Sequence, residues 1–325
     1  MSTAAPTDPN AWRAKSQNQT RLAFGQAILE LARRNPDVVA LSADTQDLIG
    51  IREFIEFFPE RFIEIGIAEQ DCIGAAAGLA TVGLLPYVCG YAPFITARSM
   101  EQVRNDVAYA HQKVVIGAAA SGISLGVSGG THHAIEDLAT MRSFPNMKVI
   151  VPADANEAYK ATLATIDMDD PVYIRLGGRG EEPNVTDPDA PFTFGKATQL
   201  HAGNDVTIIA IGCMVEMALT AAKSLKDAGV GARVLNMHTI KPIDRDAILK
   251  AAAETRGIVT AEEHHLTGGL GGAVAELLAI EHPTRMRMVG MGDEFAVVGP
   301  TGPLRTKYGM SAAAIEKAAR ELVGA

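Results

Sequence analysis

Short apolar runs alternate with amphipathic stretches along most of this 325-residue chain. Runs such as 38–41 and 114–119 are apolar on both faces, which is typical of strands in a parallel sheet that is covered on both sides. Stretches such as 20–34 and 215–228 carry their apolar residues on one helical face. The alternation predicts an α/β protein with doubly wound, mostly parallel sheets.

The pattern places the expected elements in two blocks. In the first block we expect helices at 20–34, 70–82, 96–109, 134–141 and 156–166, and strands at 38–41, 62–65, 84–90, 114–119, 147–151 and 172–176. In the second block we expect strands at 206–211, 232–237, 257–261 and 286–291, and helices at 215–228, 245–255, 269–280 and 311–323.

Between 177 and 194 the chain becomes polar and rich in Gly, Pro and Asp, which favours a linker over a packed element. We therefore predict one domain at 18–180, a linker at 181–195 and a second domain at 196–325. Residues 1–17 are polar and contain two prolines, so we expect a flexible N-terminal arm.

Composition narrows the classes of function. A net charge of −9 argues against a nucleic-acid binder or a membrane-surface protein, both of which need basic patches. The N-terminus lacks the apolar core of a secretory signal, and no apolar run reaches the ~18 residues of a membrane span. The three cysteines show no CxxC spacing and are interpreted as reduced thiols. We expect a cytoplasmic protein.

Glu69 is the first candidate for chemistry. It lies in Gly66-Ile67-Ala68-Glu69-Gln70, between an apolar strand and a helix rich in Ala and Gly. Such a helix packs tightly, and a carboxylate buried there without a partner would be very costly. The position therefore indicates a functional or a paired glutamate.

A second candidate is the Gly-rich loop 126–133, which ends in His132 and His133. Loops at the carboxyl ends of parallel strands are where open α/β sheets bind ligands. The alternative is a histidine that caps a helix or fills a turn. A metal site is less favoured, because adjacent histidines rarely share one ion and no Cys or carboxylate cluster completes the set.

Two further patterns need an interpretation. Tyr91-Ala92-Pro93-Phe94 precedes the expected helix at 96–109, which contains Arg98 and Met100, and Phe94 could equally be a core residue. Gly268-Gly269-Leu270-Gly271 opens a helix after a strand and could be read as a nucleotide fingerprint, but a lone match of this kind is weak.

Together these segments resemble the transketolase-type thiamine-diphosphate enzymes. The resemblance is carried by the Glu69 segment, by the Phe94–Arg104 helix, and by Thr131-His132 followed by 141–146 and Pro152-Ala153-Asp154. It implies a pyrimidine-binding domain followed by a transketolase C-terminal domain. It also implies that Glu69 activates the aminopyrimidine of the cofactor, that Phe94 stacks on that ring, and that further cofactor contacts come from Asp44, Arg98 and Met100.

The resemblance also implies a substrate site. His132 matches a histidine that contacts the donor sugar and assists proton transfer, His133 lies behind it, and Arg175 matches an arginine that holds the acceptor phosphate. Ser128 and Ala120 stand where relatives carry Asp and His. The identity of the sugars, and whether they are phosphorylated, therefore stays open. These departures suggest weak activity on ordinary xylulose 5-phosphate.

The Gly-Asp-Gly motif that holds the diphosphate through a metal in this family does not occur in the sequence. The resemblance therefore implies a split enzyme of α2β2 composition, in which a partner subunit holds the diphosphate and Mg²⁺ (or Ca²⁺ or Mn²⁺). Two other readings stay open within the same fold: the β subunit of a 2-oxoacid dehydrogenase, and a non-catalytic regulatory subunit. Deoxyxylulose-phosphate synthase is also similar, but it is a single long polypeptide.

Overall fold

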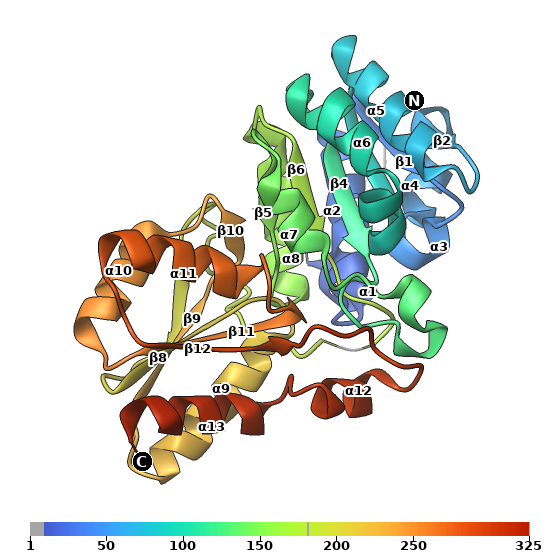
Figure 1. The fold of residues 1–325 in the computed structure, drawn as a ribbon. Coiled ribbons are helices and arrows are strands. Elements are labelled where there is room, and N and C mark those ends of the chain that lie inside the picture. Colours follow the sequence, from blue (N-terminus) through green and yellow to red (C-terminus); the bar gives the residue numbers. More distant parts are fainter. Residues whose placement is uncertain (1–9, 181, 325) are drawn as a thin grey trace.

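The computed structural model describes residues 10–180 and 182–324, which form two α/β units side by side (Figure 1). The first sheet has the strand order β10-β5-β6-β4-β3-β1-β2, and all its strands are parallel except β10. Its strands are β1 (Val38–Ser42), β2 (Phe62–Glu64), β3 (Leu85–Tyr91), β4 (Val115–Ala119), β5 (Lys148–Ile150), β6 (Val172–Arg175) and β10 (Thr239–Lys241).

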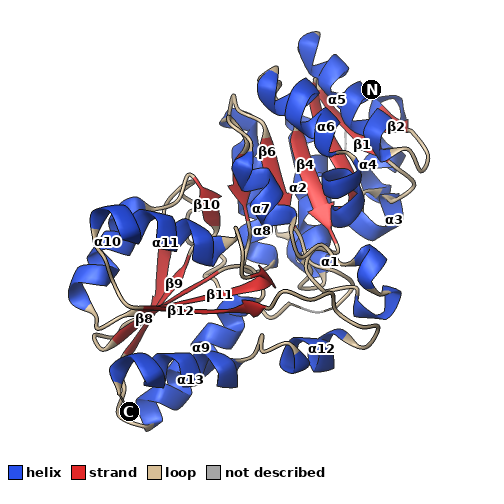
Figure 2. Ribbon diagram, in the orientation of Figure 1, coloured by secondary structure: helices blue, strands red, loops and turns tan. Residues whose placement is uncertain are grey.

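The second sheet has the order β12-β11-β8-β9-β7, with only β7 antiparallel to its neighbour. Its strands are β7 (Thr198–His201), β8 (Val206–Ala210), β9 (Ala232–Asn236), β11 (Ile258–His265) and β12 (Met286–Met291). The two mostly parallel, helix-flanked sheets confirm the predicted fold class (Figure 2).

The helices follow the predicted alternation with the strands. The first unit contains α1 (Ala11–Ser16), α2 (Thr20–Arg34), α3 (Gln46–Ile49), α4 (Arg52–Phe57), α5 (Glu69–Thr81), α6 (Met100–Gln102), α7 (Asp137–Ser143) and α8 (Ala155–Ala164). The second contains α9 (Met214–Asp227), α10 (Arg245–Glu254), α11 (Leu270–Glu281), α12 (Thr301–Lys307) and α13 (Ala312–Val323).

Each face of the first sheet has its own hydrophobic core. Successive side chains of a strand point to opposite faces, so neighbouring residues join different cores. Val38 joins the core under α2 and α8, whereas its neighbour Val39 joins the core on the opposite face. Phe24 of α2 lies so close to Gly117 of β4 that a Cβ there would come within 2.3 Å of the ring. Glycine at that position is therefore what lets the helix approach the sheet.

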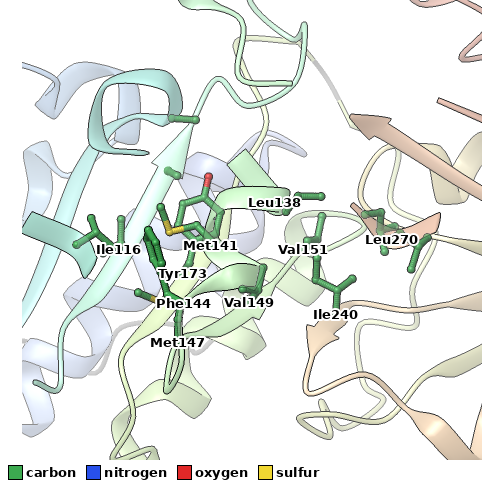
Figure 3. Packing of buried hydrophobic residues seen from close by; sticks show 14 of the residues in the cluster. Ile116, Leu138, Met141, Phe144, Met147, Val149, Val151, Tyr173, Ile240 and Leu270 are labelled. Atoms are coloured by element: carbon green, nitrogen blue, oxygen red, sulfur yellow. The ribbon is translucent and has the colours of Figure 1, made fainter. Parts of the chain in front are cut away.

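The opposite face of the first sheet shares its core with the second unit (Figure 3). Leu138, Met141 and Val151 pack in one cluster with Ile240 and Leu270. The contact is also made by backbone, because β10 pairs antiparallel with β5 and so completes the first sheet with a strand from beyond residue 195. The two units are therefore fused along one seam.

Several local predictions need correction. The predicted flexible arm includes Ala11–Ser16, which form α1; there Trp12 stacks on Tyr159 with ring centroids 3.9 Å apart. Residues 1–9 of that arm lie outside the described residues. The predicted helix at 134–141 begins only at Asp137, because Ala134 is held in an antiparallel bridge with Gly122.

The predicted helix at 96–109 is interrupted. It consists of a π-helical turn (Phe94–Arg98), α6 and a second π-helical segment (Val103–Tyr109). Such widened turns occur frequently at functional sites. Across the described residues, no helix combines the length and apolar character needed to cross a membrane.

Candidate active site

The candidate residues gather at one edge of the first sheet. Strands β1, β3 and β4 are parallel neighbours, so the loops that follow them emerge on the same side. Tyr91 ends β3 and Phe94 follows it, and the loop after β4 leads to a 3-10 turn that ends at His132. This is the edge at which open α/β sheets bind ligands.

Glu69 begins α5 and is only 3% exposed, although it carries a carboxylate. Arg98 Nη1 donates a 2.7 Å hydrogen bond to Glu69 Oε2 and so compensates the charge. The helix N-terminus adds a favourable field for the same carboxylate. Arg98 itself stays 46% exposed, so one partner of this ion pair is buried while the other reaches the surface.

Three rings meet beside this ion pair. The Phe94 and His132 rings lie 5.2 Å apart edge to face, and Tyr91 contacts both of them with centroids 5.8 Å away. The Arg98 guanidinium lies 4.4 Å from the centre of the Phe94 ring, within the range of a cation–π contact. The structure therefore brings Glu69, Arg98, Phe94 and His132 together, and it adds Tyr91, to which the sequence pattern assigns no role.

The histidine loop separates its two imidazoles. His132 is partly exposed and its Nδ1 lies 3.1 Å from the Thr131 hydroxyl, which leaves Nε2 free to face a ligand. His133 is buried, and burial lowers the pKa of its ring. His133 therefore lies behind His132, and a contact of its ring with the substrate stays a prediction. Ser128 is exposed in the preceding turn.

Arg175 lies apart from this group. Its guanidinium forms a bidentate pair with Asp137, with distances of 2.8 and 3.0 Å, and it also donates to the Glu263 carbonyl. Arg175 and Asp137 are 5% and 1% exposed. Burial opposes the charge on Asp137, but the Arg175 guanidinium outweighs it and lowers the pKa of that carboxyl. Arg175 is thus buried and paired at the seam between the two units, and its role in holding a phosphate stays a prediction.

Three other predicted residues have simpler surroundings. Asp44 is exposed in a left-handed turn (φ 56°), and its backbone N–H donates to the Glu64 carboxylate. Met100 is 45% exposed at the start of α6. Ala120 is fully buried. Among the described residues, neither Asp44 nor Met100 forms a hydrogen bond or ion pair with Glu69.

The Gly-rich turn before α11 is not free for a phosphate. Glu262 accepts hydrogen bonds from the N–H groups of Leu270 and Gly271, at 2.7 and 2.8 Å, so a side chain of the protein itself occupies this helix N-terminus. Within the described residues, no group of three or more His, Cys, Asp or Glu side chains is placed to hold a metal ion. The described cysteines are free thiols: Cys72 and Cys89 are buried and Cys213 is half-buried.

The fold and the site together define a class of protein: two α/β sheets, with a paired glutamate and a histidine loop at one edge of the first sheet. The pyrimidine-binding domain of transketolase matches residues 16–179, and the C-terminal domain of transketolase matches residues 195–315. The chain therefore belongs to the transketolase family, as the resemblance predicts.

Similar proteins cover almost the whole chain. It is 42% identical over 304 residues to a subunit of the apulose-4-phosphate transketolase of Phocaeicola vulgatus, with 93% of this chain and 97% of that protein covered. It is 41% identical over 295 residues to the 6-deoxy-6-sulfo-D-fructose transketolase subunit SqwH of Clostridium sp. (strain MSTE9), with 91% of each covered. A solved split-gene transketolase, an inactive β4 tetramer, matches with a TM-score of 0.86 and 43% identity over 94% of this chain and 98% of that one. The family implies dependence on thiamine diphosphate.

Proposed function

We propose that this chain is a subunit of a split transketolase, which transfers a two-carbon ketol unit from a ketose to an aldose. In this proposal it contributes the aminopyrimidine side of a thiamine diphosphate site. The single observation that carries the proposal is the buried carboxylate of Glu69, held by Arg98 beside the rings of Phe94 and His132.

The residues present fit the aminopyrimidine ring. Glu69 Oε2 accepts the hydrogen bond from Arg98. Among the described residues, no side chain or backbone group donates a hydrogen bond to Glu69 Oε1. One carboxylate oxygen is therefore available to a ring nitrogen. The neighbouring aromatic faces suit a flat heterocycle, because aromatic rings favour offset or edge-to-face contact.

Thiamine diphosphate, when bound, supplies the electron sink for breaking and forming carbon–carbon bonds next to a carbonyl. In our proposal Glu69 shares a proton with the pyrimidine through Oε1, and Phe94 and Tyr91 keep water from the ring. His132 exchanges a proton with the substrate hydroxyl through Nε2, while Thr131 fixes the orientation of the imidazole.

A partner subunit is part of the proposal. Both similar curated proteins are named as subunits, and the solved relative is an inactive β4 tetramer. We propose that the partner holds the diphosphate and its Mg²⁺ ion, that the two subunits assemble as α2β2, and that the active site forms between them. The proposed place of action is the cytoplasm.

The names of the relatives narrow the proposed substrates. Apulose 4-phosphate and 6-deoxy-6-sulfo-D-fructose both carry an anionic group at a terminal carbon. We propose that this chain acts on a ketose of the same kind. Ser128 and Ala120, at two positions where the resemblance expects Asp and His, support a sugar other than xylulose 5-phosphate.

The test is reconstitution with matched variants. The tagged chain is isolated from its native lysate with thiamine diphosphate and Mg²⁺, and ketol transfer by the assembled complex is measured for the wild type, Glu69→Gln and Glu321→Gln. Glu321 is a half-exposed glutamate on α13, paired with Arg287, and serves as the control. We expect Glu69→Gln to assemble normally and to lose roughly 100-fold or more in kcat.

Each contrary outcome points to a different error. If Glu69→Gln keeps wild-type activity, the carboxylate does not activate the cofactor. If the wild-type complex assembles but transfers no ketol unit to any aldose, the chain is a regulatory subunit of this fold. If the complex releases CO₂ from a 2-oxoacid instead, it is the β subunit of a dehydrogenase.

A further inference from the structure

The histidine loop (126–133) is closed at its base by backbone of the first unit. Gly122 and Ala134 exchange two hydrogen bonds, of 2.8 and 2.9 Å, across an antiparallel bridge. Between them the chain passes through two 3-10 turns, Gly126–Ser128 and Gly130–His132. Because the ends of this stretch meet, its conformation above the bridge depends on the segments against which it packs.

The second unit reaches this loop through the residues at the start of α12. The Gly299 N–H donates a 3.1 Å hydrogen bond to the Gly126 carbonyl. The Thr301 hydroxyl lies 3.3 Å from two consecutive carbonyl oxygens, those of Ile123 and Ser124, and donates to them. One side chain of the second unit therefore binds the backbone that leads into the histidine loop.

The packing at this contact is close enough to require glycine. A Cβ on Gly126 would lie 2.4 Å from the Gly299 carbonyl oxygen and 2.7 Å from Leu304 Cδ1. A Cβ on Gly129, which has a φ of +79°, would lie 2.8 Å from Val298 Cγ2. The second unit therefore packs directly on the backbone of the loop.

A short chain of hydrogen bonds connects this contact to His132. The Gly126 carbonyl, which accepts from Gly299, also accepts from the Gly129 N–H at 3.2 Å. The Gly129 carbonyl in turn accepts from the His132 N–H at 2.9 Å. A shift of the Gly126 carbonyl is therefore passed to the backbone of His132 through a single intervening residue.

The part of the second unit that contacts the loop is itself anchored. Arg305 Nε donates a 2.8 Å hydrogen bond to Glu263 Oε1 on β11, and the two side chains are 19% and 5% exposed. The Val297 N–H donates to the Tyr308 hydroxyl at 2.9 Å. Thr301 lies in the sequence between these two anchors, so its position is set by the second unit.

We propose that Thr301 is a positioning residue, which fixes the histidine loop from the second unit and thereby holds the His132 imidazole against Phe94 and Tyr91. The inference rests on the proposed function and deepens it, because it gives the second unit a part in a site whose candidate residues all belong to the first. Displacing a reacting group by about 1 Å can lower a rate by roughly 100-fold.

Hydrogen exchange of the assembled complex, followed by mass spectrometry, tests the loop without turnover. Thr301→Val removes the hydroxyl at nearly constant shape, and Thr301→Ser keeps it. In the control Thr306→Val, the lost hydroxyl is an exposed one that donates to the Gly302 carbonyl within α12. We expect Thr301→Val to speed exchange in 122–134 by about 5- to 10-fold. Thr301→Ser and Thr306→Val should exchange like the wild type.

Kinetics of the same complexes tests whether the effect reaches His132. We expect Thr301→Val to lower kcat for ketol transfer by roughly 10-fold, and Thr301→Ser to restore it. In a His132→Gln background, Thr301→Val should lower kcat no further, because the residue through which Thr301 acts has been removed.

Each outcome supports or overturns the inference. It is overturned if Thr301→Val leaves exchange in 122–134 unchanged, speeds exchange equally across both units, or costs the same in kcat with and without His132. If Thr301→Val does not fold, Tyr308→Phe carries the same tests, because it releases the anchor on Val297 and leaves the loop sequence intact. If the wild-type complex transfers no ketol unit, the proposed function fails, while the exchange rates still decide whether Thr301 fixes the loop.

Discussion

Two arginine–carboxylate pairs of this chain differ in the exposure of the arginine and in the number of bonds that join them. At the candidate active site, Glu69 is buried while Arg98 is 46% exposed and donates one hydrogen bond. At the seam between the two units, Asp137 and Arg175 are both buried and joined by two bonds. A pair with both partners buried makes the fold sensitive to the loss of either partner, whereas a pair with one exposed partner leaves a carboxylate within reach of a ligand.

Breaking the closed pair should produce the largest effect on stability. In Asp137→Asn the Arg175 charge stays buried without its counter-ion, and we expect the free energy of unfolding to fall by about 3–5 kcal/mol. Urea unfolding followed by circular dichroism measures the loss. The control Glu321→Gln breaks the exposed pair with Arg287 and should cost less than ~1 kcal/mol. Equal stabilities for the two variants would show that the seam is not held by this pair.

The pH dependence of the free energy of unfolding tests His264, a second buried residue at the seam between the two units. His264 is fully buried; its Nδ1 donates to the His265 carbonyl, and its Nε2 accepts from the Ala139 N–H, so the ring is neutral. Burial lowers the pKa of His264 to about 4, below the ~6.5 of an unfolded histidine. The unfolded chain therefore binds the extra proton between these two values. The resulting stability is complete above about pH 6.5 and is lost as the pH falls toward 4.

A measurement on the wild type by itself would not isolate this effect. Burial raises the pKa of Glu262 to about 7, so the Glu262 contribution to the free energy of unfolding falls with rising pH while the His264 contribution rises. The quantity to measure is therefore the difference in unfolding free energy between wild type and His264→Gln across this pH range. We expect the difference to shift in favour of the wild type by about 3 kcal/mol from pH 4 to 6.5. A flat difference would mean that His264 titrates normally.

Replacing each arginine by lysine should give the smallest difference in stability between the two pairs. Lysine cannot reproduce the two bonds from Arg175 to Asp137 or the added bond to the Glu263 carbonyl, so Arg175→Lys should cost roughly 2 kcal/mol. Arg98→Lys keeps a single charged bond to Glu69 and should cost less than about 1 kcal/mol. Differential scanning calorimetry of both variants measures the loss of stability. A larger loss in Arg98→Lys than in Arg175→Lys would mean that the Arg98–Glu69 pair, and not the Arg175–Asp137 pair, is the one on which the fold depends.

Much of the fold follows from local pattern. The apolar run 114–119 contains β4, and the amphipathic stretch 20–34 forms α2. A few neighbouring residues are enough to show whether an element is buried on both faces or on one. Strands β7 and β10 lie outside what the pattern predicts. Thr198–His201 is half exposed, and β10 has only three residues, so both depend on partners far away in the chain.

The candidate site follows from motifs more than from periodicity. Glu69, Phe94 and His132 come together, since the ends of parallel strands meet at one edge. Arg175 illustrates the limit: a strand-end arginine looks the same in sequence whether it faces solvent or Asp137. Thr301 is part of no recognisable motif in the sequence, and only the tertiary structure brings it against the loop that carries His132.

The pairing of β10 with β5 has a consequence for the order in which the polypeptide is made. Synthesis proceeds from the N-terminus, and the six strands up to Arg175 leave the ribosome before Thr239–Lys241. Until then, β5 is an open edge with unpaired backbone groups, of the kind that invites association with other chains. The nascent first unit therefore stays one strand short until Thr239–Lys241 has been synthesised.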